Sequence, residues 1–210
     1  IGTVAFAASG AMVGVGRKMD IFGISVLGVV TSVGGGMIRD IVLGIIPPSV
    51  FQHSVYAVVA TITSCIVFLV LHQKKELLQG EFRVHYDKIM LVMDSVGLGI
   101  FTVVGVNTGI RQGYIEHTFL LVFLGTITGV GGGLLRDMMA GVPPYIFVRH
   151  IYACASIVGA VVCVYMYRLF GAVEAMVVAS AVVIIIRYLA AHYRWNLPKL
   201  ELEEEEETKF

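Results

Sequence analysis

Charged residues are scarce in this sequence: they make up 14% of its 210 residues, against roughly 25% in soluble globular proteins. Hydrophobic residues make up 57%, and the mean hydropathy is +0.86. The formal net charge is zero, so no overall field favours nucleic acid as a partner. This composition excludes an ordinary soluble protein and predicts an all-α integral membrane protein with membrane lipids around it.

The sequence also lacks the groupings that catalysis and metal binding require. Its three cysteines, Cys65, Cys154 and Cys163, lie inside apolar runs without metal-ligand or disulfide spacing. The six histidines are scattered, and there is no nucleophile elbow, P-loop or dinucleotide fingerprint. We therefore predict no enzyme activity, no metal and no cofactor.

Long apolar runs predict seven membrane-spanning helices, since a crossing takes about 20 apolar residues. The predicted spans are residues 1–16, 21–46, 50–72, 89–108, 118–142, 147–167 and 172–190. The first span is short, and no cleavable signal peptide is visible, so we expect a few native residues before Ile1.

The distribution of basic residues predicts the orientation. One set of loops and ends holds Arg17, Lys18, Lys74, Lys75, Arg83, Lys88, Arg194 and Lys199, whereas the other holds little beyond Arg111 and Arg168. The positive-inside rule then predicts a multi-pass protein of the cell (inner) membrane, with its N-terminus outside and its C-terminus in the cytoplasm. Residues 73–88 become a cytoplasmic connecting loop, and residues 196–210 an acidic cytoplasmic tail.

The strongest signal is an internal repeat. The segment VGGGMIRD at residues 33–40 returns as VGGGLLRD at 130–137, and the similarity continues on both sides. Matching positions predict a first three-helix repeat at residues 1–72 and a second at 89–168. Because three helices are an odd number, the second repeat must be inverted in the membrane. A seventh helix at 169–195 falls outside the symmetry.

Each repeat carries three consecutive glycines in its second helix. They are Gly34, Gly35 and Gly36 in the first repeat and Gly131, Gly132 and Gly133 in the second. Close helix packing is one interpretation. The other, which we favour at this point, is a helix broken at each triple, whose freed carbonyls could face a cation or whose freed amides could face an anion. The proline pairs Pro47, Pro48 and Pro143, Pro144 would then end the broken helices.

An arginine and an aspartate follow each triple: Arg39 with Asp40, and Arg136 with Asp137. Adjacent helical residues point about 100° apart, so we expect neither arginine to pair well with its neighbour. Inverted repeats place the two pairs toward opposite faces, and Asp94 is a candidate counter-charge for the cytoplasmic pair. These charges either lock the helix structurally or line a permeation path.

Seven spans and a Gly-Gly-Gly-x-x-Arg-Asp motif in the second and fifth helices resemble prokaryotic members of the trimeric intracellular cation (TRIC) channel family, whose bacterial sequences carry a duplicated glycine transporter domain. The resemblance covers nearly the whole chain. It implies a homotrimer with one pore per subunit, constricted where helices two and five kink at their glycines, that conducts K⁺ and other monovalent cations such as Na⁺. Arg136 stands where animal relatives carry lysine, so their gating and selectivity do not transfer directly.

Three functions remain open from the sequence. The first is a cation channel with the two glycine triples at its constriction, tuned by the two arginine–aspartate pairs. The second is a secondary transporter for glycine or another small amino acid, in which a half-helix N-terminus and an arginine hold the carboxylate. The third is a membrane scaffold that transports nothing.

Overall fold

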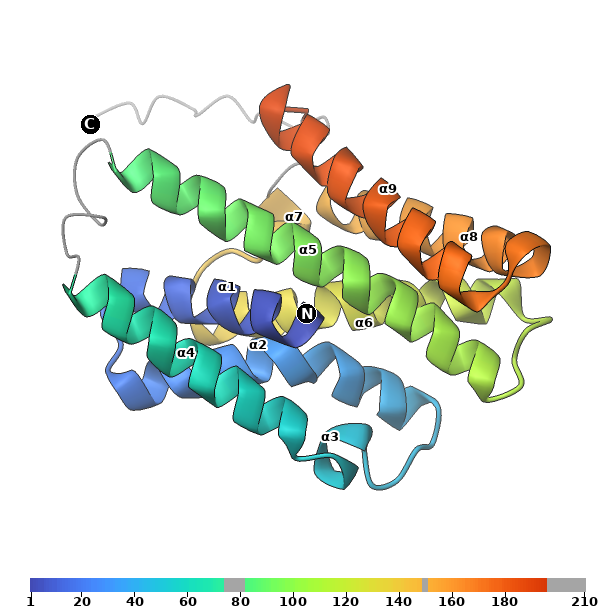
Figure 1. The fold of residues 1–210 in the computed structure, drawn as a ribbon, viewed down its shortest axis with the longest axis horizontal. Helices are drawn as coiled ribbons and strands as arrows, with labels where there is room; N and C mark the ends of the chain where they lie inside the picture. The colour runs from blue at the N-terminus through green and yellow to red at the C-terminus, as the bar shows by residue number, and fades with distance from the viewer. Residues whose placement is uncertain (74–81, 149–150, 196–210) are drawn as a thin grey trace, which may run out of the picture.

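The computed structural model describes residues 1–73, 82–148 and 151–195, and its long helices lie side by side, roughly along one axis (Figure 1). The helices are α1 (Gly2–Gly16), α2 (Ile21–Val42), α3 (Ser49–Gln52), α4 (Val55–Gln73), α5 (Phe82–Arg111), α6 (Thr118–Met139), α7 (Tyr145–Val148), α8 (Tyr152–Phe170) and α9 (Ala172–His192). Six of them are long and apolar enough to cross a membrane, and α1 is a shorter apolar helix. The prediction of an all-α membrane protein is confirmed, with six candidate spans in place of seven.

Two short helices were missed in the sequence. α3 and α7 precede the third long helix of each half, so α4 and α8 begin later than the predicted spans at 50–72 and 147–167. α5 also begins at Phe82, which makes the second part of the predicted loop 73–88 helical. Residues 74–81 and the acidic tail at 196–210 lie outside the described residues.

α2 and α6 end at glycines rather than at the predicted prolines. Gly44 and Gly141 follow the two helices with φ of +68° and +63°, a left-handed conformation that glycine adopts at little cost. In each case the next amide reaches back to an aspartate carbonyl, from Ile45 to Asp40 and from Val142 to Asp137. The proline pairs come later, in the connections, where Pro48 is the N-cap of α3.

α2 and α6 are helical throughout their glycine triples, so the predicted helix breaks are wrong. The glycines instead bring the two backbones into contact. A Cβ atom on Gly35 would lie 2.1 Å from the carbonyl oxygen of Thr128, and one on Gly132 would lie 2.1 Å from that of Thr31. This reciprocal contact, which we call the glycine crossing, supports the packing interpretation.

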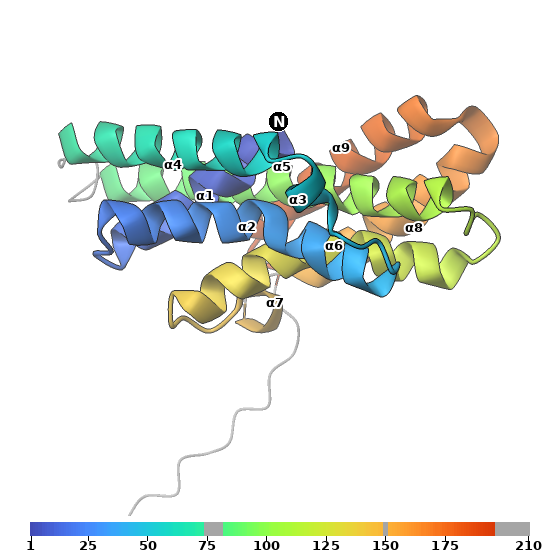
Figure 2. The same ribbon diagram turned by 90° about the horizontal axis from the view of Figure 1, so that it is seen from below.

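The two helices of the glycine crossing carry the matched sequence motifs. Figure 2 shows α2 and α6 running in opposite directions, as the matched motifs predict. Phe6 and Phe101 occupy matching positions in the first helix of each half, and their rings pack with centroids 5.1 Å apart and planes tilted by 32°. The first helix of each half packs on the second through glycine as well, because a Cβ on Gly10 or Gly105 would lie within 3 Å of the α2 or α6 backbone. These small-residue faces are therefore used in packing within the chain.

Candidate functional site

The last glycine of each triple lies beside an arginine of the same helix. A Cβ on Gly36 would lie 3.7 Å from Nη2 of Arg39, and one on Gly133 would lie 3.7 Å from Nη2 of Arg136. Residues three apart are neighbours on a helix surface, so each guanidinium lies over its own glycine. The middle glycine of each triple packs on the partner helix, whereas the last one lies beside its own arginine at an ordinary van der Waals distance. At Gly133 the hydroxyl of Tyr152 is nearer still, 2.7 Å from the Cβ position.

Each arginine pairs with the aspartate next to it, contrary to our expectation. Arg39 donates to Asp40 Oδ1 from Nε at 2.9 Å and from Nη2 at 2.6 Å. Arg136 Nε donates to Asp137 Oδ1 at 2.8 Å. The 100° offset applies to the Cα–Cβ directions, whereas the guanidinium ends a long side chain that can bend sideways to the neighbouring carboxylate.

The second oxygen of each aspartate binds the backbone beyond the proline pair. Asp40 Oδ2 accepts from the amide of Ser49 at 2.7 Å, and Asp137 Oδ2 accepts from the amide of Tyr145 at 2.8 Å. Ser49 and Tyr145 are the first residues of α3 and α7. Each aspartate therefore joins the end of a long helix to the next short helix by a charge-assisted hydrogen bond.

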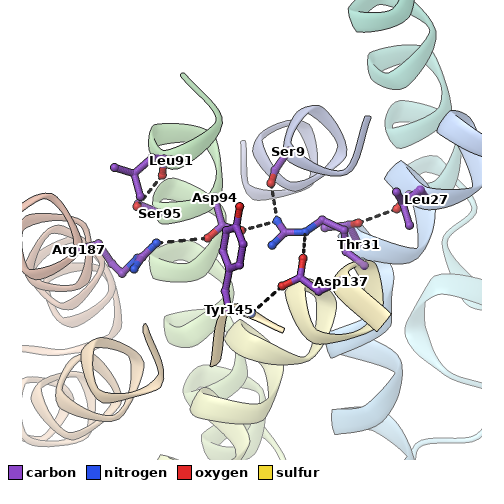
Figure 3. Close-up of polar contacts among 10 residues, drawn as sticks. Ser9, Leu27, Thr31, Leu91, Asp94, Ser95, Asp137, Tyr145 and Arg187 are labelled. Atoms are coloured by element: carbon purple, nitrogen blue, oxygen red, sulfur yellow. Dashed lines mark hydrogen bonds and ion pairs between the residues drawn. The ribbon is translucent and has the colours of Figure 1, made fainter. Parts of the chain in front are cut away.

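Arg136 is the centre of a buried cluster to which several helices contribute. The residue is fully buried, and its Nη1 donates to Ser9 Oγ on α1 and to Asp94 Oδ1 on α5, both at 2.6 Å (Figure 3). Its guanidinium also lies over the ring of Tyr145, 5.1 Å from the centroid. Asp94 is therefore the counter-charge of Arg136.

Arg187 of α9 is a member of this cluster that sequence reasoning missed. It is 1% exposed, and its Nη2 lies 3.7 Å from Asp94 Oδ2, on the side of Asp94 away from Ser9 (Figure 3). Its guanidinium carbon is 4.7 Å from the ring centroid of Tyr152. The signal was available, because an arginine inside the apolar run 172–190 would be costly against lipid and should face a buried partner.

The four charges of this cluster, Arg136, Arg187, Asp94 and Asp137, sum to zero. Burying ions costs solvation energy, which is offset only where opposite charges and hydrogen bonds replace water. The Arg39 end is simpler, with Asp40 as the ion-pair partner and 6% of the arginine exposed. Arg39 and Arg136 each follow the glycine crossing by four residues along helices that run in opposite directions, so they lie on opposite sides of it.

Several known proteins resemble this chain in sequence. A family model described as a glycine transporter matches residues 1–72 and 91–168. The UPF0126 inner membrane protein YadS of Escherichia coli is 37% identical over 97% of this chain and 95% of its own length.

Two solved structures have the same fold. One, from work on conductance through TRIC cation channels, is 32% identical, with a TM-score of 0.81 over 97% of this chain and 96% of its own. The TRIC trimeric intracellular cation channel orthologue from Rhodobacter sphaeroides is 29% identical, with a TM-score of 0.81 over 92% and 95%. The chain is a multi-pass membrane protein that belongs to the prokaryotic branch of the TRIC channel family, with its glycine transporter domain duplicated.

Proposed function

We propose that this protein is a channel for monovalent cations, permeable to K⁺, and not an enzyme. The observation that carries the proposal is its likeness over 97% of its length to a solved TRIC cation channel. By the same likeness, the working unit is a homotrimer in the inner membrane, with one path in each subunit. Its N-terminus would lie outside and its C-terminus in the cytoplasm, since the basic residues gather on one set of loops.

In this proposal the path is constricted at the glycine crossing. The carbonyl groups there belong to continuous helices, so the constriction consists of packed helix surfaces rather than of freed carbonyls. Gly35 and Thr128, like Gly132 and Thr31, leave no room between the two backbones. The described conformation is therefore closed at this point, and conduction requires α2 and α6 to move apart.

The arginine–aspartate pairs flank this constriction. Asp40 and Arg39 occupy the end that the proposed orientation places outside, and Asp137 and Arg136 the cytoplasmic end. Each carboxylate accepts hydrogen bonds from an arginine and from a backbone amide, so in the closed state it is paired within the protein rather than with a cation. A passing cation would meet neutral pairs, which lowers the electrostatic barrier that an isolated arginine would raise.

A carrier for glycine or another small amino acid is the second candidate, because the matching family model is described as a glycine transporter. Inverted repeats also serve alternating access. A channel passes ions faster than a carrier can cycle, and a carrier shows saturable uptake of its substrate, so experiment can separate the two functions.

Single-channel recording separates them. Purified protein in planar bilayers should pass K⁺ in unitary steps, because a continuous open path conducts faster than any carrier cycle. Liposomes that hold the same protein should show no saturable uptake of labelled glycine. Empty bilayers treated with detergent alone serve as the control. Silent bilayers together with robust glycine uptake would overturn the channel proposal and favour the carrier.

A further inference from the structure

α9 stands outside the repeat but supplies a charge to its centre. It packs against α5 and α8 through one narrow stripe of small residues and a single arginine. The buried residues of this stripe are Ala175, Ala179, Val183, Arg187 and Ala190. Their spacing of three or four residues places them on one helix face, while the rest of α9 is half-buried or exposed. One cation within an otherwise apolar stripe calls for a specific partner.

That partner is the oxygen of Asp94 that Arg136 does not use. Asp94 Oδ1 accepts from Arg136, whereas Oδ2 is buried and accepts no hydrogen bond among the described residues. Arg187 Nη2 lies 3.7 Å from this Oδ2. Asp94 thus contacts two arginines, Arg136 of α6 and Arg187 of α9. Figure 3 shows Arg187 reaching toward Asp94.

The charge balance depends on α9. Arg136 is shared by two carboxylates, those of Asp94 and Asp137. Without Arg187, the cluster would carry one positive and two negative charges, a net charge of minus one in a buried place. An uncompensated buried carboxylate either takes up a proton or attracts a cation.

We propose that Arg187 is a positioning residue that keeps the carboxylate of Asp94 ion-paired within the protein. In this way α9 prevents Asp94 from becoming a cation-binding site beside the path. The proposal rests on the proposed channel function. When Arg187 is neutralised, Asp94 becomes a site where cations bind, and divalent cations bind there most strongly because the attraction grows with charge. The expected result is block of K⁺ current by a divalent cation.

The test combines recording with charge-neutralising variants of the full-length protein. Arg187→Gln should tighten block of K⁺ current by Ba²⁺ by about tenfold or more, since the interaction lies in a low-dielectric site. Adding Asp94→Asn to Arg187→Gln should return the Ba²⁺ concentration needed for block to its wild-type value, because the double variant lacks the negative charge of Asp94. The matched control is Arg168→Gln, which removes an arginine whose side chain binds Ile115 and Thr118 at an exposed position; its block should equal that of the wild type. Equal block in Arg187→Gln and Arg168→Gln would overturn the proposal.

A second measurement does not depend on conduction. In thermal unfolding of the purified protein, the shifts caused by Arg187→Gln and Asp94→Asn should be strongly non-additive in the double variant, since each change removes the same interaction. Additive shifts would refute the pairing of Arg187 with Asp94. A wild-type protein that is silent in bilayers but non-additive in this cycle would refute the channel and leave the pairing intact.

Discussion

Replacing Gly35 by alanine should destabilise the protein, whereas the same change at Gly36 should not. A Cβ on Gly35 would lie 2.1 Å from the carbonyl oxygen of Thr128 and 3.2 Å from the amide nitrogen of Gly132, both backbone atoms of α6. Neither atom can move without moving its helix, so α2 and α6 must separate. The nearest atom to a Cβ on Gly36 is Nη2 of Arg39 at 3.7 Å, an ordinary contact.

Two opposing effects decide whether each substitution raises or lowers the free energy of unfolding. Alanine in place of glycine in a helix favours folding by about 1 kcal/mol. Overpacking a tight contact typically costs about 1–3 kcal/mol, and a backbone clash belongs at the upper end. We therefore expect Gly36→Ala to be neutral or stabilised by up to about 1 kcal/mol, and Gly35→Ala to lose about 2 kcal/mol.

Both values can be measured as free energies of unfolding in mixed micelles, followed by circular dichroism. The two variants carry the same substitution one residue apart on one helix, so differences in expression or in helix propensity cancel. Equal stability of the two proteins would show that α2 and α6 do not touch at Gly35.

Removing Arg136 should cost far more than removing Arg39. Arg136→Leu leaves the carboxylates of Asp94 and Asp137 buried, with one arginine, Arg187, to balance them. Breaking a buried ion pair from one side costs about 3–5 kcal/mol, because the remaining charge has lost its compensation. Arg39→Leu also leaves a net charge of minus one, on Asp40. The two changes differ because Arg136 donates to Ser9 and Asp94 as well as to the neighbouring aspartate, whereas Arg39 donates to Asp40 alone.

The same unfolding experiment measures this difference, and Arg39→Leu is the internal control because it makes the same chemical change at the symmetry-related position. Adding Asp94→Asn to Arg136→Leu should recover part of the lost stability, since one buried negative charge disappears. A loss in Arg136→Leu no larger than that in Arg39→Leu would contradict the four-charge cluster.

The arrangement of the long helices could be predicted from the sequence, because the repeat shows which helices of the two halves correspond. An eight-residue segment around each glycine triple, identical at six positions, predicts that α2 and α6 correspond and run in opposite directions, as they do in the structure. Asp94 could be matched with Arg136 because a buried arginine needs a carboxylate and few are present in the spans.

The glycine triples were misread for a physical reason. Helix propensity counts the cost of each glycine in a lone helix, whereas the contact of Gly35 with Thr128 and of Gly132 with Thr31 exists only when the two halves meet. Arg187 is not marked by the repeat, because α9 has no match in the first half. Long-range partners of this kind are set by packing, which a single sequence does not display.

The most direct test of the central claim is to lock the glycine crossing. A Cβ at Gly34 would lie 2.5 Å from Leu135 Cδ1 and 3.8 Å from Leu135 Cγ. Replacing Leu135 by cysteine removes Cδ1 and puts a sulfur at the position of Cγ, close to a cysteine at position 34. In a protein with Cys65, Cys154 and Cys163 replaced by alanine, the pair Gly34→Cys and Leu135→Cys can be oxidised and then reduced. Each single-cysteine variant is the control. K⁺ flux into liposomes should fall when the disulfide joins α2 to α6 and return on reduction; undiminished flux through fully cross-linked protein would contradict the proposal that the two helices must separate for cations to pass.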